Sequence, residues 1–98
     1  MAITHANTLQ TLDRGLRVLT CFTPSTPEWG VTALSEHLGM PKSVVHKTLA
    51  SFERWGMVVQ DVETRRYRLG LRILQLAEAV SETRELRAAA GPLMDHLS

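Results

Sequence analysis

The chain has 98 residues, 44% of them hydrophobic, and a formal net charge of +1. A chain of this length forms about one domain, and its limited core makes support from a dimer partner plausible. It has one cysteine, no apolar run near the roughly 18 residues of a membrane span, and no signal-peptide pattern at its N-terminus, so we expect a cytoplasmic protein without internal disulfides or membrane contact.

Basic residues gather in the middle of the chain. Residues 42–68 include six basic and three acidic side chains, whereas residues 1–41 and 70–98 each carry one more acidic than basic residue. A locally basic segment is what contact with nucleic-acid phosphates requires.

The first part of the chain predicts one helix and then a loop. Four apolar residues recur at helical spacing and predict a helix over residues 11–22: Leu12, Leu16, Leu19 and Phe22. A helical wheel places Arg14, Arg17 and Cys21 on the outer side of this helix. Two prolines and a glycine within residues 23–30 then indicate a loop.

The next part of the chain has the pattern of a helix-turn-helix. Thr32 is a favourable N-cap for a short helix over residues 33–38. Gly39 supplies the left-handed residue that ends this helix, and Pro41 suits the first turn of a third helix over residues 41–55. Two helices joined by about three residues around a glycine are typical of this motif.

The third helix has an apolar inner stripe and a polar outer face. The inner stripe has the spacing i, i+3, i+4 and i+7: Val45, Thr48, Leu49 and Phe52. Steps of about 100° per residue turn four residues outward and place two more beside them: Ser43, Lys47, Ala50 and Arg54, with Val44 and His46 as neighbours.

Two short segments predict a β-hairpin, the wing of a winged helix. Residues 57–61 are rich in β-forming residues, and residues 67–70 alternate in polarity, with a charged turn between them. A further short strand is expected near Trp29. The predicted fold class is mainly α with a small β-hairpin, a winged helix-turn-helix over residues 9–70 followed by a linker helix.

We expect the linker helix to begin after Gly70. Its apolar arc is broader than one small domain needs, so we expect it to meet a second subunit through these residues: Leu71, Ile73, Leu74, Leu76, Ala77 and Val80. A fifth helical stretch begins near Arg84, and its pattern is unfinished at Ser98. Residues 71–98 are therefore predicted to be linker helices that lead to a domain absent from this sequence.

Three sequence motifs together resemble the IclR family of bacterial regulators. They are LDRGLRVL in residues 12–19, G-x-P-K-S-x-V-H-K in residues 39–47 and Y-R-L-G in residues 67–70. The resemblance spans residues 9–98. It implies an N-terminal domain that binds an operator, a C-terminal domain that binds a small-molecule effector, and assembly as a homodimer or tetramer.

The sequence departs from the family in two respects. The effector-binding domain is missing, so we expect a piece of a longer protein in which the absent C-terminal domain binds the effector. Thr48 stands where leucine is usual, which slightly weakens the core. The resemblance also places a contact with the DNA backbone at Arg14.

DNA binding is the predicted function, because the major groove of B-DNA accepts one α-helix. We assign contacts to six residues of the third helix: Lys42, Ser43, Val44, His46, Lys47 and Arg54. Lys47 would reach a guanine or a phosphate, and Val44 a thymine methyl group. His46 would form a hydrogen bond. Arg54 would contact a phosphate or make no contact with DNA.

The wing tip is the second predicted contact with DNA. Arg65 and Arg66 would reach the minor groove or the backbone, with Arg65 the stronger candidate. The simpler interpretation is that these charges only keep the hairpin edge soluble. Arg68 alternates with Tyr67 along the strand and would instead pair with an acidic residue.

Two functions compete for this sequence. The first is a transcriptional regulator that binds a pseudo-palindromic operator as a dimer, with two recognition helices in successive major grooves. The alternative is a winged helix used only for protein–protein contact, which the basic, small-residue outer face disfavours because such interfaces use apolar anchors. The four histidines lack metal-ligand spacing and no phosphate-binding glycine loop is present, so we expect no enzyme, metal or cofactor.

Overall fold

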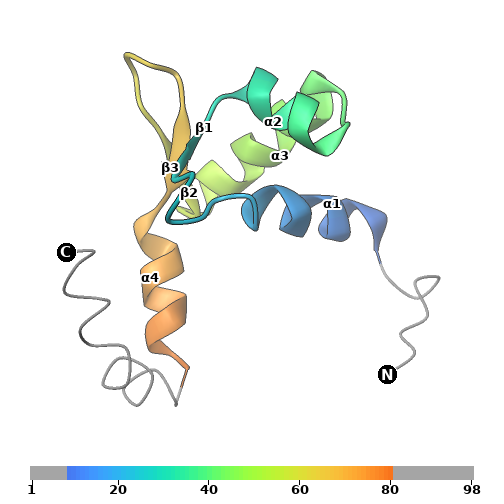
Figure 1. The fold of residues 1–98 in the computed structure, drawn as a ribbon. Helices are drawn as coiled ribbons and strands as arrows, with labels where there is room; N and C mark the ends of the chain where they lie inside the picture. Colours follow the sequence, from blue (N-terminus) through green and yellow to red (C-terminus); the bar gives the residue numbers. More distant parts are fainter. Residues whose placement is uncertain (1–8, 81–98) are drawn as a thin grey trace.

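A computed structural model describes residues 9–80, in which three helices pack together with a small antiparallel sheet at one side, and a fourth helix leaves the body (Figure 1). The elements in chain order are α1 (Gln10–Leu19), β1 (Glu28–Trp29), α2 (Val31–Leu38), α3 (Lys42–Arg54), β2 (Val58–Gln60), β3 (Tyr67–Leu69) and α4 (Leu71–Glu78). This is a winged helix-turn-helix, as predicted. The predicted fifth helical stretch lies outside the described residues.

The core lies where α1, α2, α3 and the sheet meet. Five of its side chains have no exposed surface: Val18, Leu34, Val45, Leu49 and Val58. Phe22, Met40 and Tyr67 are also buried. Full burial of a valine or leucine contributes about 1.5–3 kcal/mol relative to exposure, so contributions from all of these elements hold the domain together.

α2 ends as the sequence predicts but does not begin as predicted. Gly39 has φ +67, and the Met40 N–H donates to the Ser35 carbonyl at 3.1 Å, which closes α2. The predicted N-cap at Thr32 is wrong. The helix begins at Val31 directly after β1, and the Leu34 N–H already bonds the Gly30 carbonyl at 3.0 Å, so Thr32 lies inside the first turn.

The prediction for α1 requires two corrections. The helix ends at Leu19 rather than Phe22, because the Thr20 hydroxyl donates to the Leu16 carbonyl at 2.9 Å and the chain then bends. Leu12 and Leu16 do not face the core and are 57% and 46% exposed. The buried line of α1 passes through Gly15 and Val18 instead.

Gly15 explains why the two leucines are displaced from the core. A Cβ atom at Gly15 would lie 3.3 Å from the ring of Phe52 and 3.9 Å from the Thr48 methyl group. The close approach of α1 to α3 therefore occurs at a residue with no side chain, which a pattern of apolar side chains cannot reveal.

Cys21 was predicted on the outer side of the first helix, and this is also wrong. It follows the helix, is half-buried and packs against the core, and its thiol donates to the Arg17 carbonyl at 3.3 Å. The Trp29 indole N–H donates to the Cys21 carbonyl at 2.9 Å. This bond ties the loop after α1 to β1.

The sheet has the strand order β1-β3-β2, so the predicted hairpin gains a third strand. Tyr67 of β3 lies opposite Trp29 on one side and Gln60 on the other, and Arg68 lies opposite Glu28. The strand expected near Trp29 is confirmed. Figure 1 shows the loop between β2 and β3 projecting from one end of the sheet and α4 leaving from the other.

Gly70 sets the direction of α4. Its N–H donates to the Met57 carbonyl at 2.7 Å, and the Arg72 N–H donates to the Gly56 carbonyl at 3.2 Å. A Cβ atom at Gly70 would lie only 2.3 Å from the Gly56 oxygen. Only glycine fits this approach, which fixes the start of α4 against the end of α3.

Candidate nucleic-acid interface

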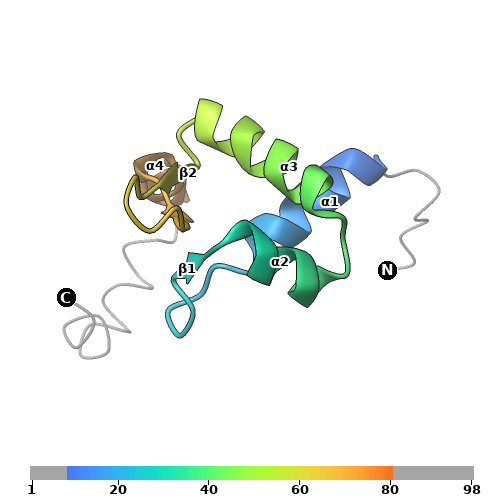
Figure 2. The ribbon, with the colours of Figure 1, turned by 90° about the horizontal axis from the view of Figure 1, so that it is seen from above.

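α3 presents a polar face to solvent on the side opposite its buried residues. The exposed residues of this face are Lys42 and five residues that the helical wheel turned outward or placed beside them: Ser43, His46, Lys47, Ala50 and Arg54. Val44 is different, because it is half-buried and packs against the core. Figure 2 shows α2 and α3 side by side above α1, with the outer face of α3 left uncovered by either helix.

The buried side chains on the opposite side of α3 fix the orientation of this face. Val45 and Leu49 are fully buried, and Phe52 is half-buried against the same core. The Thr48 hydroxyl donates to the Val44 carbonyl at 2.7 Å, so a polar atom in the inner stripe has a hydrogen-bond partner. The predicted inner stripe is confirmed.

The basic residues of this face have no acidic partners within the described chain. Among residues 9–80, no ion pair joins Lys42, Lys47 or Arg54 to a carboxylate. Unpaired cations on a rigid helix face are available to a ligand that carries negative charge.

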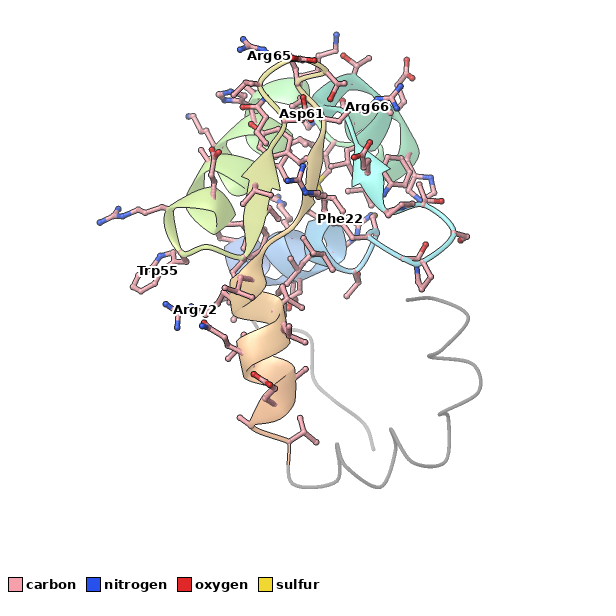
Figure 3. The ribbon with its side chains drawn as sticks, turned by 90° about the vertical axis from the view of Figure 1, so that its left-hand side faces the viewer. Phe22, Trp55, Asp61, Arg65, Arg66 and Arg72 are labelled. Carbon is pink, nitrogen blue, oxygen red and sulfur yellow. The ribbon has the colours of Figure 1, made fainter. Side chains whose placement is uncertain are left out.

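The wing tip is a closed loop. The Asp61 N–H donates to the Arg66 carbonyl and the Arg65 N–H to the Asp61 carbonyl, each at 2.8 Å. Arg65 adopts a left-handed conformation with φ +67. Backbone hydrogen bonds from Thr64 and Glu63 hold the pKa of the Asp61 carboxyl below its ordinary value. Figure 3 shows Arg65 and Arg66 at the tip of the wing.

A groove joins the wing tip to the helix-turn-helix. It has a volume of about 600 Å³ and lies between the start of α2, the exposed side of α3 and the wing. Its walls include Thr32, His46, Gln60, Arg65 and Arg66. The structure therefore brings one predicted contact residue of α3 and both predicted arginines of the wing to the same depression.

The sequence analysis missed four polar residues of this groove. Thr32 was assigned to a cap, and Glu36, Gln60 and Thr64 were assigned no role. Gln60 donates to the Arg65 carbonyl at 3.0 Å, and the first turn of α2 has no side-chain cap, which leaves backbone N–H groups and a partial positive charge at that end. Gln60 lies opposite Tyr67 in the hairpin, so the two predicted strand segments on either side of the charged turn were the sequence signal that could have placed it near the wing tip.

The remaining predicted contacts lie elsewhere. Arg14 is exposed on α1 and does not line the groove. Arg54 lies at the far end of α3, where it shares a second depression with Trp55 and Arg72. Figure 3 shows Trp55 and Arg72 near the junction with α4, far from the wing tip. Arg68 is exposed and lies across from Glu28 in the sheet.

The residues predicted for dimerisation are mostly exposed. Leu71 is 67% exposed, and Leu74, Leu76 and Val80 are about half exposed. The other two differ: Ile73 is half-buried and Ala77 is exposed. Val80 lies beyond the end of α4, which stops at Glu78. The described part of the chain therefore leaves most of this apolar surface in contact with solvent.

Two side chains in or against the core have shifted pKa values. Burial raises the pKa of the Cys21 thiol, against an opposing effect of Arg17. Burial and Glu53 raise the pKa of the Tyr67 hydroxyl.

Within residues 9–80, no three His, Cys, Asp or Glu side chains gather as metal ligands, and no described helix is long and apolar enough to cross a bilayer.

Known proteins are similar to this chain in sequence and in fold. The family profile described as the IclR helix-turn-helix domain matches residues 11–62. The chain is 28% identical over 90 residues to the HTH-type transcriptional regulator XynR of Escherichia coli, covering 92% of this chain and 36% of that protein. It is 30% identical over 93 residues to the glycerol operon regulatory protein of Streptomyces coelicolor, covering 95% and 37%.

Solved structures agree with these matches. An IclR family transcriptional regulator from Brucella abortus is 34% identical with a TM-score of 0.74, covering 91% of this chain and 34% of that chain. An IclR homolog from Microbacterium hydrocarbonoxydans complexed with 4-hydroxybenzoate is 25% identical with a TM-score of 0.72, covering 89% and 36%. The chain thus spans about a third of the length of these relatives. It belongs to the IclR family of transcriptional regulators, whose helix-turn-helix domain it carries.

Proposed function

We propose that this chain binds a specific double-stranded DNA operator with α3 in the major groove and the wing on the adjacent backbone or minor groove. One observation carries the proposal. The basic side chains of α3 have no acidic partner among residues 9–80, and His46 of the same helix lines a groove of about 600 Å³ together with both arginines of the wing tip. Small or hydrogen-bonding side chains on a recognition helix and basic side chains around it are what groove reading and phosphate contact require.

The residues have separate roles in this proposal. Ser43 and Ala50 are small and let α3 approach the base edges, where Lys47 and His46 form hydrogen bonds. The half-buried Val44 offers part of its side chain to a thymine methyl group. Lys42 lies at the start of α3, where cationic charge and the helix N-terminus together favour a phosphate.

The wing and the two remaining arginines contact the backbone in this proposal. Arg65 and Arg66 lie at the wing tip and follow the neighbouring phosphates or enter the minor groove. Arg54 and Arg14 contribute backbone contacts from the end of α3 and from α1. Such contacts fix the position of the protein on the duplex and make affinity depend on salt.

We further propose that two copies bind a pseudo-palindromic operator. Leu71, Leu74 and Leu76 of α4 are half or more exposed, and Leu12 and Leu16 add apolar surface on α1. Apolar residues exposed in such numbers on a small domain mark a site for a protein partner. A two-fold dimer would place its recognition helices in successive major grooves, so the operator would share that symmetry.

Control by a small molecule is proposed for the full-length protein. The relatives are about three times as long as this chain, and one of them was solved with 4-hydroxybenzoate bound. A domain beyond the helix-turn-helix would bind an effector and change the DNA affinity of the dimer. We place this regulator in the cytoplasm, and we assign it no catalytic activity or cofactor.

Selection of bound sequences from a random duplex pool at two salt concentrations tests the proposal. We expect a pseudo-palindromic sequence that is still bound at the higher salt concentration, because contacts with bases persist when counterion release weakens phosphate contacts. Recovery of random sequences, with all binding lost at the higher salt concentration, would contradict sequence-specific recognition. That result would favour a module for protein–protein contact.

A further inference from the structure

Asp61 places a carboxylate in the part of the molecule that is proposed to face DNA. It is half-buried at the end of β2, where the wing turns (Figure 3). A carboxylate beside a phosphate backbone weakens binding by repulsion. Its side chain therefore needs a role other than direct contact with DNA.

The hydrogen bonds of Asp61 supply that role. One oxygen of its carboxylate, Oδ1, accepts the N–H groups of Glu63 at 2.8 Å and Thr64 at 2.9 Å. The backbone of Asp61 bonds Arg66 through its N–H and Arg65 through its carbonyl. Hydrogen bonds to a charged acceptor are stronger than those between neutral groups. A single residue thus bonds the backbone of every residue from 63 to 66.

The conformation of Arg65 shows what these bonds maintain. Its φ of +67 is unfavourable for any residue with a side chain, and a bulky residue remains there only when its surroundings enforce it. Gln60 donates to the Arg65 carbonyl at 3.0 Å, and the Thr64 hydroxyl accepts the Arg66 N–H at 3.2 Å. The loop therefore holds both arginines by their backbones and leaves their side chains exposed.

We propose that Asp61 is a positioning residue for DNA binding: its carboxylate holds the wing tip in the conformation that presents Arg65 and Arg66, so the wing is ordered before DNA arrives. This inference rests on the proposed DNA-binding function. A preordered loop loses little conformational entropy on binding, whereas a loose loop carrying the same arginines binds more weakly.

A matched pair of variants separates this role from simple electrostatics. Asp61→Ala and Glu63→Ala each remove one carboxylate from the wing tip, but of these two carboxylates it is that of Asp61 that accepts backbone hydrogen bonds there. Electrostatic repulsion alone predicts tighter DNA binding by both variants. Positioning predicts that Asp61→Ala weakens binding by about threefold to tenfold, while Glu63→Ala leaves it unchanged or slightly tighter.

Asp61→Asn supplies the rescue. Its amide oxygen accepts the same two N–H groups without the negative charge, so we expect DNA affinity equal to or above that of the parent. Affinity is measured by fluorescence anisotropy on a duplex recovered from a random pool with the parent chain. Hydroxyl-radical footprints should show that Asp61→Ala loses protection at the wing position and keeps it at the position of α3.

A second measurement needs no DNA. Amide hydrogen exchange at Glu63 and Thr64 should accelerate in Asp61→Ala and stay close to the parent rate in Asp61→Asn, with a cooperative thermal unfolding transition retained in both. If the parent binds its duplex and Asp61→Ala binds as tightly as Glu63→Ala, the positioning role is overturned and the proposed function stands. If the parent binds no duplex, the proposed function fails and this inference fails with it.

Discussion

α3 and α4 bury their apolar faces to different extents, although the two helices meet where Gly70 lies against Gly56. Val45 and Leu49 of α3 have no exposed surface, whereas Leu74 and Leu76 of α4 are 51% and 50% exposed. Both helices are amphipathic, and both begin within a residue of where the sequence predicts them to begin. An amphipathic pattern therefore predicts that a helix forms and that one face is covered, but it does not predict which molecule covers that face.

The difference assigns the helices to separate tasks. The apolar stripe of α3 is used within the domain, so its opposite face is held rigidly toward solvent and is available to DNA. The apolar stripe of α4 is left for a partner, which we propose is a second copy of the chain. Substitutions in the two helices should therefore affect different measurements.

The largest effect on stability is expected from Leu49→Ala in the core. Removing this fully buried side chain leaves a cavity and should lower the free energy of unfolding by about 2–5 kcal/mol. Leu74→Ala on α4 is the matched control, and we expect less than about 1 kcal/mol because half of that side chain is already exposed. Urea denaturation followed by circular dichroism measures both, and equal losses would remove the contrast between the helices.

Gly70→Ala tests the junction that sets the direction of α4. The added Cβ atom would lie 2.3 Å from the Gly56 oxygen, so α4 or β2 must shift, and we expect a loss of about 1–3 kcal/mol. Gly30→Ala is the control, because no atom lies within 4 Å of the added Cβ, and its effect should stay below about 1 kcal/mol. Similar thermal unfolding of the two variants would show that the close contact at Gly70 does not matter.

Leu76→Glu tests the proposed partner of α4. We expect the free energy of unfolding of the monomer to change by less than about 0.5–1 kcal/mol, since the residue is half exposed. Self-association should fall, because a carboxylate buried between two copies has no partner. Sedimentation equilibrium gives the mass in solution, and a variant that assembles as the parent does would exclude this part of α4 from the interface.

The smallest effect concerns the wing and pH. Because its pKa is lower in the folded loop than its ordinary value of 3.8, Asp61 stabilises the loop above that value, and the contribution is lost as the pH falls through the folded pKa. The amide signals of Glu63 and Thr64 should therefore stay unchanged from about pH 8 to pH 5 and move at lower pH with a midpoint below 3.8. Movement near neutral pH would contradict the assignment of the acceptor.

The sequence predicted the helix-turn-helix well because its signals are local. Gly39 predicts the turn between the two helices, and the spacing of Val45 and Leu49 predicts the buried face of α3, each within a few residues. The face of α1 was mispredicted because its closest contact occurs at Gly15, where the decisive property is the absence of a side chain. Hydrophobic periodicity carries no information about such a contact.

The groove and the wing could be predicted only in part. Arg65 and Arg66 were identified by charge alone, but their conformation depends on bonds formed across the hairpin by Asp61 and Gln60. The groove joins α2, α3 and the wing, which lie far apart in the sequence. Its polar lining follows from the packing of the three elements, so a pattern within one element cannot show it.

The most direct test of the DNA interface is the salt dependence of binding to the selected duplex for the parent, Lys47→Ala and Arg65→Ala. Arg72→Ala removes a cation near the junction with α4, far from the wing, and serves as the control (Figure 3). We expect Arg65→Ala to weaken binding across sequences and to reduce the salt slope by about 1. Lys47→Ala should weaken binding and, if it touches a base, relax specificity, while Arg72→Ala should match the parent. If Lys47→Ala and Arg65→Ala both match the parent in affinity and salt slope, this face of the molecule is not the DNA interface.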